Sequence, residues 1–238
     1  MIDKDPIGRA IRDFSQGKST ESIVVHCDLS EDDILPVPYL FRSFKEMPEM
    51  EKIALKRASG RVLDVGAGAG PHALYLLKNG LEVKAIDTSP LAVKHMQSLG
   101  IDATERSFLN YNGESFDTIL LLMNGIGLAG TLENLPEFLV HCKNLLNPGG
   151  RIICDSTDVR YFFEDEEGAT WIDLNNNYYG QFRFQMEYMD CKSDWFDWLY
   201  LDGETLSEHA RNAGLDMEIL YEEEAAFLAE LTLKNLEG

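Results

Sequence analysis

Basic residues are scarce in this 238-residue sequence: 21 lysines and arginines stand against 41 aspartates and glutamates, for a formal net charge of −20. A surface this negative repels phosphate backbones, so nucleic acid is excluded as an expected partner. The sequence also lacks an apolar run long enough to span a bilayer, and its first residues lack the pattern of a signal peptide. We therefore expect a cytoplasmic protein with no membrane partner.

Cysteine and histidine are few, and they are scattered. The four cysteines have no C-x-x-C spacing and no nearby histidine cluster; they are Cys27, Cys142, Cys154 and Cys191. This distribution argues against a zinc site or a redox pair. We expect reduced, mostly buried thiols and no metal. Nothing in the sequence indicates the oligomeric state.

The most informative pattern is the run 61–70, in which a short apolar strand ends in three glycines spaced by two, Gly66, Gly68 and Gly70. Glycines in such a turn allow positive φ and let a ligand approach the backbone without meeting a Cβ. A helical pattern follows at 71–78, and the amides at its start point at whatever is bound. The run therefore predicts a site for a nucleotide-like cofactor.

From about residue 48 helices and strands alternate, which predicts a doubly wound α/β fold with a mostly parallel sheet between helices. Two final strands read as an antiparallel hairpin that completes a seven-stranded sheet. The predicted strands are 62–65, 82–87, 103–107, 116–123, 151–154, 217–221 and 227–233, with a turn at 147–150 before the fifth.

We expect a single domain over residues 1–238, with two segments outside the regular core. Its parts are an N-terminal cap (1–47), a cofactor-binding core (48–160), an aromatic β-rich insert that serves as a lid (161–201) and a C-terminal helix with the last strands (202–238). In the insert, 181–188 alternates polar and apolar residues, as an antiparallel strand does, and 195–201 is a candidate partner for it.

The spacing of the glycines separates two cofactor classes. A dinucleotide-binding turn follows G-x-G-x-x-G, and counted from Gly66 its third glycine would fall at Pro71. Here the third glycine comes one residue earlier. The motif Asp64-x-Gly-x-Gly-x-Gly70 resembles the first motif of the class I S-adenosylmethionine-dependent methyltransferases.

Three further motifs follow in the order found in that family, over roughly residues 50–155. Asp87 ends the second predicted strand, Phe116-Asp117 opens the fourth, and the segment 145–152 leads into the fifth. The resemblance implies that Asp87 accepts hydrogen bonds from the ribose hydroxyls of the cofactor. The family's acidic residue that accepts from the adenine amine is replaced by Ser107, with Glu105 as the alternative in another register.

The resemblance implies S-adenosyl-L-methionine as cofactor and S-adenosyl-L-homocysteine as product. Candidate cofactor-binding residues are Asp64, Gly66, Ala67, Gly68, Gly70, Asp87, Thr88, Ser107, Phe108, Met123, Asn124, Arg42 and Tyr39. Within this set Phe108 could stack on the adenine, Arg42 would bind the cofactor carboxylate, and Asn124 would position the reactants. A surface ion pair for Arg42, and a purely structural tie of the glycine turn for Asp64, remain open.

Residues outside the motifs give weaker predictions. His72 begins the helix after the glycine turn, where a surface position is expected. Asp155 ends the fifth predicted strand and could act as a base, although a structural or surface role is favoured. Candidate acceptor contacts in the insert are Tyr178, Tyr179 and Trp195. No catalytic residue is assigned.

The sequence thus predicts methyl transfer from S-adenosylmethionine to a small-molecule acceptor by in-line displacement, in a dry pocket that aligns the reacting atoms. One alternative is an NAD(P)-dependent oxidoreductase or epimerase, which Pro71 and the lack of a Tyr-x-x-x-Lys pattern argue against. The other is a non-catalytic, cofactor-binding partner subunit. The identity of the acceptor and its nucleophilic atom are not fixed by the sequence.

Overall fold

The computed structural model describes residues 4–19, 21–163 and 177–234. Seven strands form one sheet in the order β11-β12-β7-β6-β3-β4-β5. They are β3 (Arg61–Val65), β4 (Glu82–Asp87), β5 (Asp102–Glu105), β6 (Phe116–Leu121), β7 (Leu146–Thr157), β11 (Leu215–Glu223) and β12 (Ala226–Leu233). Strands β3 to β7 pair in parallel, and β12 joins β7 antiparallel. The predicted fold class is confirmed.

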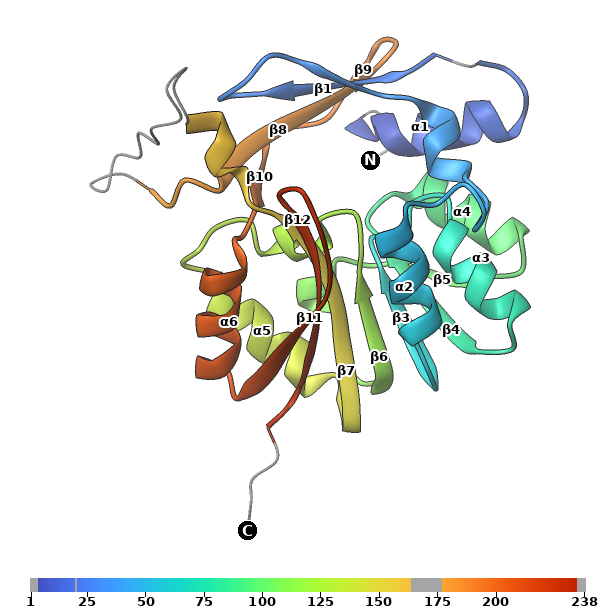
Figure 1. The fold of residues 1–238 in the computed structure, drawn as a ribbon. Coiled ribbons are helices and arrows are strands. Elements are labelled where there is room, and N and C mark those ends of the chain that lie inside the picture. The colour runs from blue at the N-terminus through green and yellow to red at the C-terminus, as the bar shows by residue number, and fades with distance from the viewer. Residues whose placement is uncertain (1–3, 20, 164–176, 235–238) are drawn as a thin grey trace.

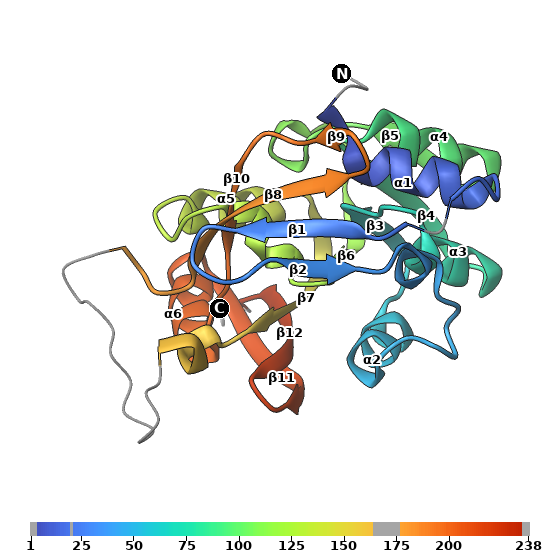
Figure 2. The ribbon, with the colours of Figure 1, turned by 90° about the horizontal axis from the view of Figure 1, so that it is seen from above.

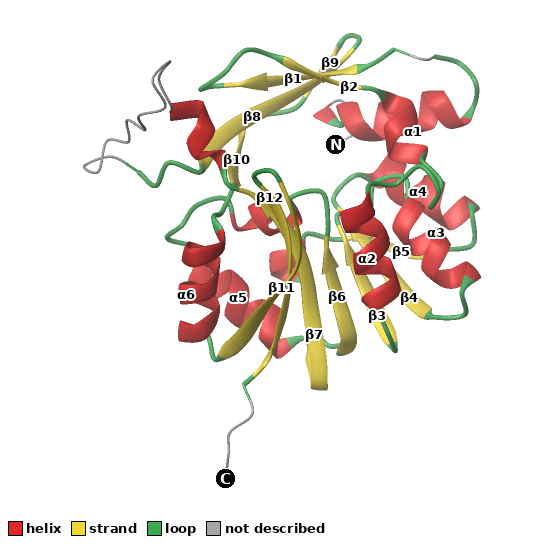
Figure 3. Cartoon of the chain, viewed as in Figure 1, coloured by secondary structure: helices red, strands yellow, loops and turns green. Residues whose placement is uncertain are grey.

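Helices cover both faces of this sheet, which is therefore buried like other parallel sheets (Figure 3). One face packs against α2 (Glu49–Arg57), α3 (Pro71–Lys78) and α4 (Pro90–Ser98). The other packs against α5 (Leu135–Asn144) and α6 (Gly203–Asn212). In β6, four consecutive residues from Thr118 to Leu121 are buried, as a near-continuous apolar strand in the middle of such a sheet should be.

Strand β7 differs from its prediction because it runs through the segment 147–150, where the sequence predicts a turn before the strand. The irregular geometry is still visible inside the strand. Gly149 has a φ of +78°, and the pairing of β7 with β6 shifts register between Phe116 and Thr118. A Cβ on Gly150 would lie 2.9 Å from the carbonyl oxygen of Asn147, so this position needs glycine. The turn residues are absorbed as a bulge.

The N-terminal segment and the insert together build a second sheet, which we call the cap sheet. Its order is β10-β8-β1-β2, with β9 also paired to β8. The strands are β1 (Ile23–Cys27), β2 (Asp33–Leu35), β8 (Gln181–Tyr188), β9 (Cys191–Lys192) and β10 (Phe196–Leu199). The predicted pairing of the 195–201 segment with 181–188 is therefore present. The sequence treats cap and insert as separate parts, whereas β1 pairs with β8 along its length.

The cap sheet lies across the carboxyl ends of the parallel strands (Figure 1). Seen from above, β1, β2 and β8 extend over β3, β6 and β7 (Figure 2). Helix α1 (Pro6–Ser15) joins cap to core, because Ala10 and Ile11 pack with Ile23 and Tyr188 of the cap sheet and with Ala92 of α4. Ligands of doubly wound sheets bind outside the carboxyl ends of the strands, so this is the edge where a site is expected.

Candidate functional site

The glycine turn after β3 leaves open space around its first two glycines. Gly66 and Gly68 have φ of +68° and +56°, and a Cβ on either would meet no atom within 4 Å. The turn is fixed to strand β4, because the backbone amides of Gly66 and Ala67 both donate to the carbonyl oxygen of Ile86, at 2.9 and 3.2 Å. The backbone is therefore rigid and accessible, as a cofactor cradle requires.

Gly70 has a different role from the first two glycines. It begins α3 with a φ of +80°, and a Cβ there would lie 2.8 Å from Cδ1 of Ile101 and 2.9 Å from Cγ of Met96. This glycine permits close packing of the turn on α4 and the segment that follows it. Its contribution to a cofactor site is therefore through the shape of the turn.

Asp87 lies beside the open glycines at the end of β4. Its Oδ2 accepts a hydrogen bond from the amide of Gly68 at 2.9 Å, and its Oδ1 accepts from the amide of Ser89 at 2.8 Å. Burial raises the pKa of Asp87, while these amides lower it. Each oxygen keeps a further lone pair, so the carboxylate is able to accept hydrogen bonds from a pair of ribose hydroxyls.

Asp64 anchors the glycine turn to the helix that follows it, which was one of the two roles that the sequence left open for this residue. It is buried, and its Oδ2 accepts a hydrogen bond from the amide of Ala73 in the first turn of α3. Burial raises its pKa to about 6. Asp64 thus anchors the helix start behind the glycine turn.

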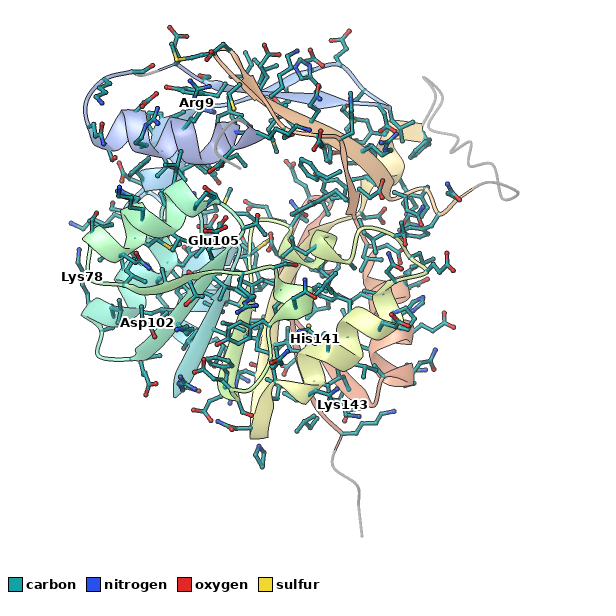
Figure 4. The ribbon with its side chains drawn as sticks, turned by 180° about the vertical axis from the view of Figure 1, so that it is seen from behind. Arg9, Lys78, Asp102, Glu105, His141 and Lys143 are labelled. Carbon is teal, nitrogen blue, oxygen red and sulfur yellow. The ribbon has the colours of Figure 1, made fainter. Side chains whose placement is uncertain are left out.

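An open hollow of about 540 Å³ lies beside the end of β4 and β5. It is lined by Thr88, Glu105, Arg106, Ser107 and Asn110. Figure 4 shows Glu105 at the end of β5 that faces the cap and Asp102 at the opposite end. Glu105 is in register with Asp87, so both candidate adenine contacts, Ser107 and Glu105, lie near the ribose candidate.

Phe108 does not take the position that adenine stacking needs. Its side chain is buried in the core, with its ring centroid 5.2 Å from that of Phe138 and 4.9 Å from that of His141. The short helix η3 (Phe108–Asn110) turns the ring inward under α5. The suggested stacking by Phe108 is therefore wrong, and the residue instead supports the loop that carries Ser107.

Arg42, Glu51 and His72 form a buried charged cluster behind the glycine turn. The guanidinium of Arg42 donates to both carboxylate oxygens of Glu51, and Nε2 of His72 lies 2.9 Å from Oε2 of the same glutamate. Burial would raise the pKa of Glu51, but the hydrogen bonds from His72 and Arg42 outweigh it and hold that pKa below its usual value. All three residues are at most 6% exposed, so the surface position expected for His72 is wrong, and the ion pair of Arg42, left open as a surface one, is buried.

Tyr39 covers this cluster. The guanidinium carbon of Arg42 lies 4.0 Å from the centre of the Tyr39 ring, and Nη1 of Arg42 donates to the Tyr39 carbonyl oxygen at 2.6 Å. Tyr39 belongs to the short helix η2 (Val37–Phe41), and its side chain remains exposed. The exposed part of this stack is therefore the Tyr39 ring, which lies over the buried guanidinium of Arg42.

The end of β6 carries the most strained backbone of this edge. Met123 and Asn124 are consecutive residues with φ of 63° and 56°, a conformation that costs free energy in residues other than glycine. The amide of Asn124 donates to Oδ2 of Asp155 at 2.9 Å, and its side-chain oxygen accepts from Thr157 at 3.0 Å. Short contacts to β7 thus hold the strained residues in place.

Of the three candidate acceptor contacts, Tyr178 and Tyr179 lie side by side, with ring centroids 4.5 Å apart, and Trp195 belongs to another part of the cap sheet. Trp195 stacks on Arg183, which is exposed and alternates with the inward-facing residues of β8, so Trp195 belongs to the solvent face of the cap sheet. The prediction that Trp195 faces the acceptor is therefore wrong. The hydroxyls of Tyr178 and Tyr179 bond to Oδ2 of Asp202, the residue that caps α6. These two hydroxyls already have a structural partner.

The inner face of the cap sheet carries aromatic residues that the sequence did not single out as acceptor contacts. Cross-strand partners share a face, and Phe196 pairs with Phe184 while Trp198 pairs with Phe182. Trp198 rests on the backbone of the short helix η4 (Gly125–Ala129): a Cβ on Gly127 would lie 2.2 Å from its indole nitrogen. This face therefore meets the core beside the strained end of β6. The even-numbered alternation in 182–188 is the signal that would have found it.

Within residues 4–19, 21–163 and 177–234, no helix has both the length and the apolarity to cross a bilayer. The same ranges contain no group of three or more histidine, cysteine, aspartate or glutamate residues placed to hold a metal ion.

The parallel sheet with its antiparallel final hairpin, the open glycine turn and the carboxylate of Asp87 beside it define a class I S-adenosylmethionine-dependent methyltransferase. Comparison with known families agrees. The chain belongs to a family described as a methyltransferase domain, whose model matches residues 40–218. This membership favours the methyltransferase prediction over the nicotinamide-dependent alternative.

Among solved structures, the chain is similar to a SAM-dependent methyltransferase from Bacteroides fragilis in complex with S-adenosyl-L-homocysteine. The identity is 44%, the TM-score is 0.92, and the match covers 98% of this chain and 96% of that one. The cap sheet is therefore included in the shared fold.

Two curated relatives are more distant. A demethylmenaquinone methyltransferase from Tropheryma whipplei is 31% identical over 113 residues, which cover 44% of this chain and 45% of the relative. A ubiquinone biosynthesis O-methyltransferase from Xanthomonas oryzae is 31% identical over 105 residues, 41% of this chain and 43% of the relative. These matches span less than half the length of either relative.

Proposed function

We propose that this protein binds S-adenosyl-L-methionine in the turn after β3 and transfers its methyl group to a small-molecule acceptor held under the cap sheet. The observation that carries the proposal is the pairing of Asp87 with the open glycines, Gly66 and Gly68, on an edge that an aromatic face covers. The relative with S-adenosyl-L-homocysteine in its structure, 44% identical over nearly the whole chain, supports the same cofactor.

The residues of this chain divide the cofactor among them. The amides around Gly66, Ala67 and Gly68 contact it along the turn, and Asp87 accepts from the ribose hydroxyls. Thr88 and Ser107, with Glu105 beside them, contact the adenine in the hollow. In this proposal, the glycine turn and the ends of β4 and β5 bind the adenosine part of the cofactor.

The methionine half lies toward the buried charged cluster. Arg42, whose guanidinium donates to Glu51 and to a carbonyl oxygen, retains N–H groups for the cofactor carboxylate, and Tyr39 lies over it. Met123 and Asn124 border the position of the methyl group. When bound, the cofactor supplies an electrophilic methyl on a sulfonium, so the protein's task is to orient the acceptor and to exclude water.

The acceptor is a small molecule and not a nucleic acid, because a net charge of −20 disfavours phosphate backbones. The names of the curated relatives, which act in quinone biosynthesis, are compatible with an aromatic acceptor. A cytoplasmic location and contacts of Tyr178 or Tyr179 with the acceptor remain part of the proposal.

Two measurements test the proposal in sequence. Calorimetric titration with S-adenosyl-L-homocysteine should show a single site per chain, and absence of binding would reject the cofactor assignment. Incubation with methyl-labelled S-adenosylmethionine and a low-molecular-weight cell extract, followed by mass spectrometry, should then yield a labelled product. Tight cofactor binding without any labelled product would favour the non-catalytic subunit, and quenching or enhancement of NADH fluorescence would revive the nicotinamide alternative.

A further inference from the structure

Asp155 is a buried carboxylate that the structure leaves half-satisfied. It lies two residues before the end of β7, where that strand meets the edge under the cap sheet. The residue is 9% exposed. Its Oδ2 accepts a hydrogen bond from the amide of Asn124, but its Oδ1 is buried with no hydrogen-bond partner among the described residues. A buried carboxylate oxygen without a donor is costly, so it calls for an explanation.

Fold stability does not explain this carboxylate. Its strand neighbour in β12 is Leu228, which is apolar and offers no side-chain donor. The hydrogen bond to Asn124 fastens the strained turn after β6, but an asparagine oxygen would make the same bond without a buried charge. The second oxygen, Oδ1, therefore makes no stabilising hydrogen bond with the described residues of the ligand-free fold. Buried polar groups that lower stability in this way are common at functional sites.

The ionisable groups around Asp155 come from four other elements. Although burial is the largest cause of its shift, the charge of Glu51 in α2 also raises the pKa of Asp155, and that of His72 in α3 lowers it. Tyr39 of η2 and Tyr200, which follows β10, lie near enough that its negative charge raises their pKa values, although burial is the larger cause for both. Cys154, its neighbour in the chain, is a fully buried thiol whose pKa is raised by burial first.

Tyr200 connects this carboxylate to the cap sheet. The charges that act on its hydroxyl include Cys27 and Asp33 of the cap sheet as well as Asp155 of the core. Its ring packs edge-on against Phe182 at 5.4 Å and Phe184 at 6.3 Å between centroids. Tyr200 thus packs on the aromatic inner face of the cap sheet, within range of the charge of Asp155.

The surroundings suit a flat ring that carries a polar group. Phe184, Phe196 and Trp198 share the inner face of the cap sheet, and all three remain partly exposed in the ligand-free structure. Aromatic walls with a few convergent polar groups are the usual lining of small-molecule sites. Here the polar groups are the carboxylate of Asp155 and the hydroxyl of Tyr200.

We propose that Asp155 is the base that removes the proton from a hydroxylated aromatic acceptor, a phenol or catechol, held under the cap sheet with Tyr200 as its positioning residue. This proposal rests on the proposed function, to which it adds a class of acceptor and a base. The acceptor O–H bond breaks and its proton passes to the Asp155 carboxylate. The oxygen lone pair forms the new bond to the methyl carbon, and the electron pair of the broken carbon–sulfur bond stays on sulfur.

The acid–base properties of Asp155 agree with this role. Burial raises its pKa to about 7, and the amide of Asn124 lowers it only in part. A base whose pKa lies near the working pH combines a useful ionised fraction with the driving force to accept a proton. The side chain is ionised above about pH 7 and protonated below it, so turnover of a phenol should fall as the pH drops through that value.

The first experiment replaces Asp155 by asparagine and follows cofactor binding and turnover separately. The acceptors are a set of one- and two-ring phenols and catechols with labelled S-adenosylmethionine, and their O-methyl ethers serve as blanks. Asp155→Asn should bind S-adenosyl-L-homocysteine within threefold of the unmodified protein, while kcat on the phenol falls by about 100-fold or more. Asp216→Asn, an exposed aspartate of β11, is the matched control and should leave both quantities unchanged.

A readout without turnover is the titration of Asp155 itself. A carboxyl-carbon NMR signal with a pKa near 7 should be present in the ligand-free protein and missing from Asp155→Asn. Should that variant not fold, Tyr200→Phe takes its place. We expect it to raise the KM of the phenol about tenfold and to leave both the pH dependence of kcat and the affinity for S-adenosyl-L-homocysteine as they are.

Distinct results overturn the two proposals. If the unmodified protein methylates no phenol but labels a tertiary amine, a thioether or a carbon atom, the base role is wrong and the methyltransferase proposal stands. The base role also fails if Asp155→Asn keeps its kcat within threefold. If S-adenosyl-L-homocysteine does not bind the unmodified protein, the proposed function fails first.

Discussion

The two sheets of this protein follow different physical rules. The seven-stranded sheet draws its parallel strands from one stretch of chain, buries them on both faces and positions a turn of fixed geometry at their carboxyl ends. The cap sheet joins the N-terminal hairpin to strands near the other end of the chain, pairs antiparallel throughout and keeps most of β8 partly exposed. The buried sheet thus holds the glycine turn in a fixed geometry, whereas the cap sheet leaves aromatic side chains partly exposed at the ends of the parallel strands.

The largest effect is expected at the buried charged cluster that joins the end of η2 to helices α2 and α3 of the core. Glu51→Ala leaves Arg42 and His72 buried without their carboxylate partner, so the free energy of unfolding should fall by about 3–5 kcal/mol. Urea denaturation measures it. Glu49→Ala, an exposed glutamate on the same helix, should change stability by less than about 0.5 kcal/mol. Equal effects of the two substitutions would contradict the role given to the cluster.

The second prediction concerns the rigid sheet alone. Asp87→Ala removes the acceptor for the amides of Gly68 and Ser89 and for the ribose, so the Kd for S-adenosyl-L-homocysteine should rise about 100-fold. Isothermal calorimetry measures the change. Asp102→Ala, at the other end of the neighbouring strand β5, should leave the Kd unaltered. An Asp87→Ala protein that binds with unaltered affinity would sink the ribose assignment.

A third substitution should separate the acceptor side from the cofactor side. In Gly127→Ala the new Cβ collides with the indole of Trp198, so β10 must shift, at a cost of about 1–3 kcal/mol in stability. We expect hydrogen exchange to increase in β8 and β10 with little change in β3 and β4. The Kd for S-adenosyl-L-homocysteine should stay within threefold. A large loss of cofactor affinity would show that the two sides are not separable.

The smallest effect is a pH dependence confined to the cap sheet. His26 of β1 bonds to Glu187 of β8 at 2.8 Å and to Asp32 at 2.9 Å, and these contacts raise its pKa, with Glu187 the larger cause. The resulting stabilisation is fully present below the unfolded pKa of about 6.5 and is lost as the pH rises through the higher folded value.

Because all three groups remain in contact with solvent, which screens their interaction, the gain is less than about 1 kcal/mol. Hydrogen exchange, corrected for its intrinsic pH dependence, should speed up in β1 and β8 above that pH while β3 and β6 stay protected. The variant His26→Gln should remove the pH dependence. Identical pH responses in both sheets would contradict a local effect.

Prediction from sequence succeeded wherever the signal was local. The apolar strands and the glycine spacing occupy consecutive residues, and the structure keeps both with boundaries displaced by a few positions, as in β6 and β12. Asp87 was proposed as the ribose contact because it ends the second strand, where the resembling family places an acidic residue, and the structure places it beside Gly68. Short-range patterns of this kind specify backbone conformation directly.

Prediction failed where the outcome depends on distant partners. His72 was predicted to lie at the surface, and the partner of Arg42 was left open, because nothing near them in the sequence shows that Glu51 is buried beside both. Trp195 and Trp198 are equally aromatic, yet the register of β10 on β8 sends Trp198 to the core side, and Trp195 stacks on the outward-facing Arg183. A shift of one residue would exchange the faces of β10, so composition cannot decide this.

By itself, then, the sequence determined the class of fold, the glycine cradle and the kind of cofactor, since each is written in residues close together along the chain. Only the tertiary structure decided that two distant segments form one cap sheet and which aromatic residues it turns toward the core. It also decided that Asp155 is buried with one oxygen that no described residue donates to. Strand register and burial are set by long-range packing, and they define the acceptor side of the molecule.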